Sequence, residues 1–176
     1  MGGRMLRLVF STIAAATLIG ASVPSSPDLG KAEGKCRANE NGPAFLVGVS
    51  GLLDRTGKLK LEIYPANDTD FLADDNVLVS AGEVFRRVEE PVPASGAVRL
   101  CIRVPSAGTY AVSLLHDRNG NRKFDWTIDG IGFAGNPKLG WGKPKAATAS
   151  AVATAEPTPI VIVMNYRRGF AMRPIQ

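Results

Sequence analysis

The sequence predicts an all-β protein in which two antiparallel sheets, of about seven strands in total, pack face to face as a sandwich. Apolar and polar residues alternate over residues 58–64 and 98–104, which is the pattern of strands with one buried face. Strand-like segments recur at near-regular spacing, and no long amphipathic helix stands out after residue 30. These observations favour a β-sandwich over a helical or mixed fold.

The positions of apolar residues and turn formers predict the individual elements. Residues 65–76 hold four Asp and two Asn and predict a long loop, and residues 54–57 predict a turn. Residues 82–88 fit a strand or a short helix, and the prolines that follow favour the strand. The other expected strands are 45–49, 58–64, 98–104, 109–115 and 160–164, and the best remaining helix candidate is 146–155.

The N-terminus has the pattern of a secretory signal peptide. Arg4 and Arg7 precede an uncharged run over residues 8–21, and small residues follow. The run is short for a permanent membrane span, although an uncleaved anchor is the alternative. The expected organisation is a signal peptide at 1–24, a flexible lead-in at 25–42, a β-sandwich domain at 43–168 and a C-terminal tail at 169–176. Export places the protein in a bacterial periplasm or outside the cell.

The overall charge excludes some classes of partner and site. The formal net charge is +5 and falls to +3 without the two N-terminal arginines. No basic stripe interleaved with aromatic residues is present, so we expect no nucleic-acid partner. One His and two Cys cannot supply a site with two imidazoles or a four-thiolate zinc centre.

The two cysteines, Cys36 and Cys101, have two interpretations. An exported protein meets an oxidising compartment, which favours a disulfide between them. Such a bond would stabilise the fold by about 4 kcal/mol on the chain-entropy model. The alternative is a free thiol at Cys101, activated by the neighbouring Arg99 and Arg103.

The densest polar signal lies at residues 117–129 and suggests a weak calcium loop. Oxygen-bearing side chains occupy its relative positions 1, 3, 5 and 9, and the carbonyl of Lys123 falls at position 7. Arg122 replaces the usual glycine, and Asp129 lies one residue beyond the usual last ligand. The alternative is a metal-free hairpin turning at Asn119-Gly120. The candidate ligands are Asp117, Asn119, Asn121, Lys123, Asp125 and Asp129.

Three aromatic residues near the glycine-rich segment 130–142 form the second candidate site. Trp126, Phe133 and Trp141 could stack on a sugar ring or seat an envelope protein, so carbohydrate and envelope protein are the candidate partners. The alternative is that they close one end of the sandwich. The single histidine, His116, is expected to be structural.

Several of these motifs resemble one bacterial secreted family, domain of unknown function 2141. The resemblance lies in the strand and polar loop at 108–125, the Gly-Phe segment at 129–136 and the terminal Met164-Asn165-Tyr166, and it extends over about residues 44–166. It implies a secreted sandwich of transthyretin-like or immunoglobulin-like type and implies no established activity.

These signals together predict an exported, non-catalytic binding module. The first alternative is a structural, envelope-associated module without a ligand. The second is a hydrolase that pairs Asp residues of 65–76 with Asp125. The sequence shows no nucleophilic triad and no phosphate loop.

Overall fold

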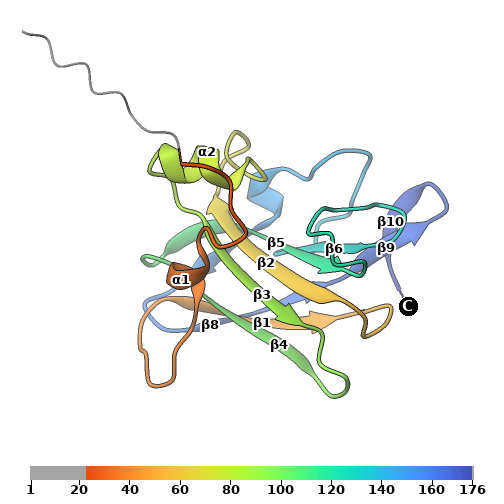
Figure 1. Ribbon diagram of the computed structural model, residues 1–176, viewed down its shortest axis with the longest axis horizontal. Coiled ribbons are helices and arrows are strands. Elements are labelled where there is room, and N and C mark those ends of the chain that lie inside the picture. The colour runs from red at the N-terminus through yellow and green to blue at the C-terminus, as the bar shows by residue number, and fades with distance from the viewer. Residues whose placement is uncertain (1–22, 176) are drawn as a thin grey trace, which may run out of the picture.

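The computed structural model describes residues 23–175 and shows two β-sheets packed as a sandwich, as predicted (Figure 1). All but the last two residues of the expected signal peptide lie outside the described residues. Between residues 23 and 175, no helix is long and apolar enough to cross a membrane.

The smaller sheet has three strands in the order β4-β1-β8. These are β1 (Ala44–Ser50), β4 (Val98–Arg103) and β8 (Thr158–Val163). β4 runs antiparallel to β1, whereas β8 runs parallel to it, which is the one departure from a wholly antiparallel sandwich.

The larger sheet has seven strands, and β5 lies at its centre. Its order is β10-β9-β6-β5-β2-β3, and β7 pairs with the first half of β5. The strands are β2 (Lys58–Pro65), β3 (Arg86–Pro91), β5 (Gly108–Asp117), β6 (Gly130–Phe133), β7 (Ser150–Ala153), β9 (Asn165–Arg168) and β10 (Ala171–Pro174). The ten strands exceed the expected seven because β6, β7, β9 and β10 are only four residues long, too short to show alternation.

The main core lies between the sheets. Leu59, Leu61 and Ile63 of β2 are all buried there, on the face that their alternation predicts. A second cluster covers the outer face of the larger sheet, where Phe71 and Phe133 meet edge to face at 5.8 Å between ring centroids. β5 is therefore covered on both faces, and nearly all of its side chains are buried.

The expected strand at 82–88 and the expected helix at 146–155 both need correction. Residues 75–80 form the short helix α2 (Asp75–Ser80), and the strand expected at 82–88 begins only at Arg86. The reason is tertiary, because Leu78 of α2 is buried in the second cluster. Residues 146–155 contain one turn of 3-10 helix, η1 (Ala146–Thr148), followed by β7.

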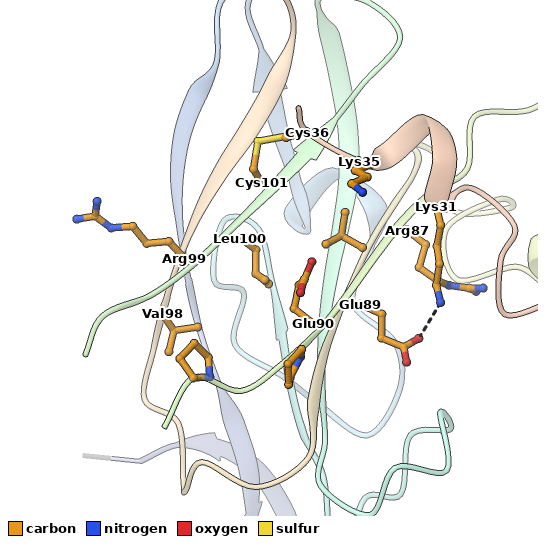
Figure 2. A pocket seen from close by; sticks show the side chains of 13 residues that line it. Lys31, Lys35, Cys36, Arg87, Glu89, Glu90, Val98, Arg99, Leu100 and Cys101 are labelled. Atoms are coloured by element: carbon orange, nitrogen blue, oxygen red, sulfur yellow. Dashed lines mark ion pairs between the residues drawn. A yellow bond between two sulfur atoms is a disulfide. The ribbon is translucent and has the colours of Figure 1, made fainter. Parts of the chain in front are cut away.

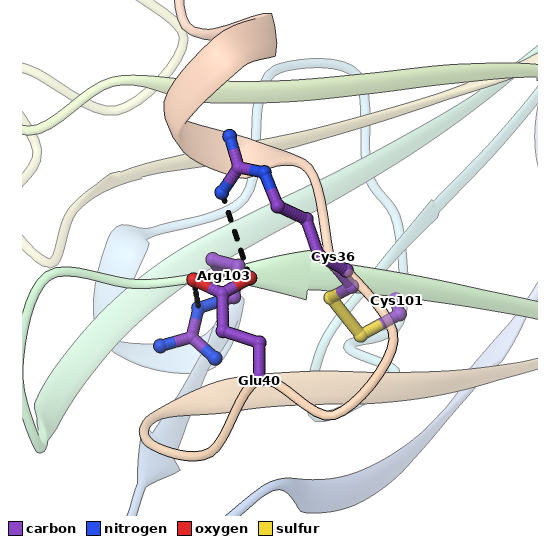
Figure 3. Close-up of a disulfide and its surroundings, with 5 residues drawn as sticks. Cys36, Glu40, Cys101 and Arg103 are labelled. Carbon is purple, nitrogen blue, oxygen red and sulfur yellow. Dashed lines mark ion pairs between the residues drawn. A yellow bond between two sulfur atoms is a disulfide. The ribbon is translucent and has the colours of Figure 1, made fainter.

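The lead-in and the tail are both more ordered than expected. The lead-in contains α1 (Lys31–Gly34) and is joined to β4 by a Cys36–Cys101 disulfide, with 5.9 Å between the Cα atoms. Figure 3 shows this bond beside the ion pair of Glu40 with Arg103, at 3.7 Å. Glu40 also pairs with Arg37 at 3.5 Å. The expected tail forms β10, which pairs with β9. The partner of the lead-in, β4, is distant in sequence and is not revealed by local patterns, whereas β10 pairs with the neighbouring strand β9.

Candidate functional site

An apolar cavity of about 400 Å³ lies where β6 and β10 meet three loops. All three predicted aromatic residues, Trp126, Phe133 and Trp141, line it. The full lining is Leu72, Phe124, Trp126, Ile131, Phe133, Leu139, Gly140, Trp141, Gly142, Lys143, Pro144, Phe170, Ala171 and Met172. The structure thus brings together residues that the sequence separates by about a hundred positions.

The aromatic side chains differ in how they are held. Phe133 is buried and belongs to the second core cluster, so it is structural as well as part of the lining. Trp126 is partly exposed, and the Arg167 guanidinium lies over its ring at 4.6 Å. Trp141 is 90% exposed between two glycines. The interpretation that these aromatics only close the sandwich therefore holds for Phe133 and not for Trp141.

Sequence reasoning missed two other aromatic members of the cavity. Phe124 lies in the loop before Trp126 and is 45% exposed. Phe170 is 79% exposed in the turn between β9 and β10, where Gly169 adopts a positive φ of 65°. The sequence signal for Phe170 was an aromatic residue that follows a glycine and two arginines. Because a tail is expected at residues 169–176, Phe170 is not a candidate from the sequence.

The cavity offers apolar contact and little hydrogen bonding. Its only charged lining residue is Lys143, whose Nζ already donates to the carbonyls of Asp68 at 2.9 Å and Phe71 at 2.8 Å. The remaining lining side chains are apolar, apart from glycine, which has none. This chemistry suits an apolar group better than a sugar, whose hydroxyl groups require several polar partners.

The polar loop at 117–129 is held by its own backbone. The Asp117 carboxylate accepts N–H groups from Gly120 and Arg122, each at 2.8 Å. Asp129 accepts N–H groups from Arg118 and Asp125, each at 2.9 Å. Both carboxylates are buried, so each stabilises the loop whether or not a cation is bound.

The remaining candidate ligands also fold back on the loop. The side-chain oxygen of Asn119 accepts the N–H of Asn121, and that of Asn121 accepts the N–H of Lys123. Asp125 accepts two hydrogen bonds from Thr127, and these lower the pKa of its carboxyl. Within residues 23–175, no group of three His, Cys, Asp or Glu could hold a metal ion. A cation here would therefore have at most two carboxylate ligands and would need amide and carbonyl oxygens as well.

Two loop arginines are directed to partners outside the loop. Arg118 binds Asp54 and holds the pKa of that carboxyl well below its usual range. Arg122 pairs with Glu89 of β3 at 3.0 Å. Their charges are thus partly neutralised away from the candidate ligands.

His116 is a buried structural residue. Its Nε2 lies 2.7 Å from the Thr56 carbonyl and its Nδ1 lies 2.6 Å from the Tyr166 hydroxyl. This pattern fits a neutral ring that donates from Nε2 and accepts at Nδ1. Burial lowers the pKa of His116, which favours the neutral form.

Several acidic residues of the hydrolase alternative are held by other groups. Asp68 accepts the N–H of Ala146 at 2.7 Å, and Asp75 pairs with Arg87 at 3.1 Å. Asp125 is bound to Thr127. No hydrogen bond among the described residues joins Asp125 to the acidic residues of 65–76.

A second cavity, of about 450 Å³, lies between β3 and β4. Figure 2 shows the disulfide at one end and the ion pair of Lys31 with Glu89, at 3.8 Å, at the other. Burial alone would raise the pKa of Glu89, but the cations Lys58, Arg122 and Lys31 lower it. These charges are already paired, so this cavity is part of the attachment of the lead-in.

A family model described as an uncharacterized protein conserved in bacteria, DUF2141, matches residues 47–160. Neither a curated protein nor a solved structure matches the chain. The matched range includes β6, Trp126, Phe133, Trp141 and the polar loop, and it ends before Phe170.

Proposed function

The chain belongs to the DUF2141 family of uncharacterized bacterial proteins, and from its site we propose that it is an exported, non-catalytic binding module. The main support for this proposal is the apolar cavity, which has four exposed aromatic residues at its edge: Phe124, Trp126, Trp141 and Phe170. Soluble domains rarely expose large apolar patches unless the patch binds something. The ligand therefore contributes an apolar group to this cavity.

Export is the second part of the proposal. The Cys36–Cys101 disulfide is typical of proteins that fold in an oxidising compartment, such as a periplasm or the cell exterior. The predicted signal peptide at 1–24 supports the same destination.

The cavity favours one of the expected partner classes. A carbohydrate needs several hydrogen-bonding side chains, and Lys143, the only charged lining group, is already engaged. An apolar side chain of an envelope protein, or an acyl chain, needs only burial and shape. We therefore assign an apolar ligand to the cavity, ahead of a sugar.

The neutral probe N-phenyl-1-naphthylamine tests this assignment. We expect saturable binding, and we expect Ala171→Phe, which fills the cavity, to weaken it roughly tenfold, equivalent to about 1.4 kcal/mol. Val152→Phe adds the same ring at an exposed position outside the cavity lining and serves as the matched control. Fluorescence titration of the purified protein provides both affinities.

Absent or non-saturable probe binding would favour the structural, ligand-free alternative. Equal weakening by Ala171→Phe and Val152→Phe would place the probe elsewhere. Stronger binding of neutral oligosaccharides than of the probe would restore the carbohydrate assignment.

A weak calcium site at 117–129 is a second candidate function. It is favoured by the ion pairs of Arg118 with Asp54 and of Arg122 with Glu89, which partly neutralise the two arginines of the loop. Millimolar calcium, relative to EDTA, should raise the melting temperature, with an affinity of about 0.1–1 mM. Asp117→Ala combined with Asp125→Ala should abolish the rise.

Magnesium at the same concentration is the control for general ionic effects. If calcium and EDTA give the same melting temperature for the unmodified protein, the loop is a metal-free structural element. If the double variant keeps the full calcium effect, the cation binds elsewhere.

A further inference from the structure

The positive charge of this protein is concentrated in one part of the chain. Residues 136–176 contain six Lys or Arg and one Glu, so this segment accounts for the whole net charge of +5. These cations are exposed, and we term five of them the basic rim. Within residues 23–175, four of the five form no ion pair, and the fifth, Lys145, lies 4.0 Å from Asp68. The basic rim consists of Lys138, Lys145, Arg167, Arg168 and Arg173.

The basic rim lies beside the aromatic cavity. Lys138 and Lys145 line a hollow that shares Lys143 with the cavity. Arg168 and Arg173 line another hollow that shares residues such as Met172 with it. No Asp or Glu among the described residues lines any of these three depressions. The three depressions are therefore lined by basic and uncharged residues, and one acidic side chain, Asp68, lies beside Lys145.

Two of the most exposed apolar side chains project from separate turns on this surface. Trp141 stands between two glycines in the loop after β6, and Phe170 lies in the turn between β9 and β10. β9 and β10 lie at one end of the larger sheet, away from β3 and α1 (Figure 1). Tryptophan is enriched at membrane–water interfaces, and neighbouring cations are attracted to anionic lipid.

We propose that this face docks onto a bilayer containing anionic phospholipid. Trp141 and Phe170 enter the interfacial region, and the basic rim meets the lipid phosphates. This proposal rests on the proposed function, because Trp141 and Phe170 also line the apolar cavity. On a bilayer, the apolar group closest to the cavity is a lipid acyl chain. A bilayer is favoured over an acidic protein because exposed aromatic tips need no matching surface to be buried in lipid.

Vesicle flotation with the purified protein tests the proposal. We expect binding to vesicles of equal phosphatidylglycerol and phosphatidylcholine, and roughly tenfold weaker binding to phosphatidylcholine alone. Both tryptophans line the cavity, so their emission should shift to shorter wavelength on binding. Added salt should weaken binding by screening the charges.

Matched charge reversals locate the docking surface. Lys138→Glu with Arg168→Glu should weaken vesicle binding by about tenfold or more. Lys35→Glu with Arg99→Glu changes the net charge equally on the exposed lead-in and β4, and should leave binding unchanged. Trp141→Ala with Phe170→Ala should also weaken binding, without changing the salt dependence.

Three results would overturn the docking proposal. The first is that the unmodified protein does not bind anionic vesicles. The second is that both charge-reversal variants lose vesicle binding equally. The third is that the protein binds polyglutamate in preference to vesicles. The last result would assign the surface to an acidic polypeptide. Probe binding in the cavity is measured on the same variants, so a failure of docking is distinguished from a failure of the proposed function.

Discussion

Arg87→Ala should destabilise the fold by about 3–5 kcal/mol, because it leaves the buried Asp75 carboxylate without a cation among the described residues. Within the same part of the chain, it leaves Glu62 with Lys60 alone, at 3.5 Å. The Arg87 guanidinium contacts Glu62 at 2.8 Å and Asp75 at 3.1 Å, and all three side chains are less than 10% exposed. It also donates to the backbone carbonyls of Ser26 and Pro27, so it attaches the lead-in to β3. Burial alone would lower the pKa of Arg87, but Glu62 and Asp75 raise it, so the side chain remains charged.

Urea unfolding measures this loss, with Arg86→Ala as the control. Arg86 precedes Arg87 on β3, and within the described part of the chain its side chain donates only to the carbonyl of Phe85. Its removal should therefore change the free energy of unfolding little. Combining Glu62→Gln with Arg87→Ala should recover part of the loss, since one of the two carboxylates that lose Arg87 is removed. Equal effects of Arg86→Ala and Arg87→Ala would show that the buried ion network contributes no more than a surface arginine.

Cys36→Ser combined with Cys101→Ser should cost about 4 kcal/mol, by removing a cross-link that restricts the unfolded chain. The cysteines are 65 residues apart in sequence, which makes the closed loop long. For a domain of this size, the melting temperature should fall by roughly 8–16 °C. The bond also fixes the lead-in beside β4, where Lys35 forms an isolated β-bridge with Ile102.

Calorimetry of the variant and of the unmodified protein in reductant provides the comparison. Both should melt at the same lowered temperature, because reduction removes the same cross-link. An unchanged melting temperature in the variant would contradict the stabilising role. Two thiols that react in the folded, air-oxidised protein would contradict the disulfide itself.

The sandwich was predictable because its central strands are amphipathic. Leu59, Leu61 and Ile63 alternate with polar residues, and all three are buried in the core. The strand Arg86–Pro91 resembles an exposed edge by sequence, yet the structure buries Arg87 beneath the lead-in. Its ionic partners come from distant segments, so local patterns could not reveal this.

The aromatic part of the candidate site was also partly predictable. Trp126, Phe133 and Trp141 are close in sequence and line one cavity, whereas Phe170 joins them only through the pairing of β10 with β9. The basic rim was hidden for a similar reason, because the charges are spread over about forty positions and converge only in the fold. Whole-chain net charge gave no indication of their location.

Energy transfer from tryptophan to N-phenyl-1-naphthylamine tests the apolar cavity most directly. Trp126 and Trp141 are the only tryptophans of the chain, and both line the cavity, so probe bound there lies close to every donor. We predict saturable transfer that Ala171→Phe weakens roughly tenfold and Val152→Phe leaves unchanged. Probe binding without transfer, or transfer insensitive to Ala171→Phe, would contradict a ligand site at this cavity.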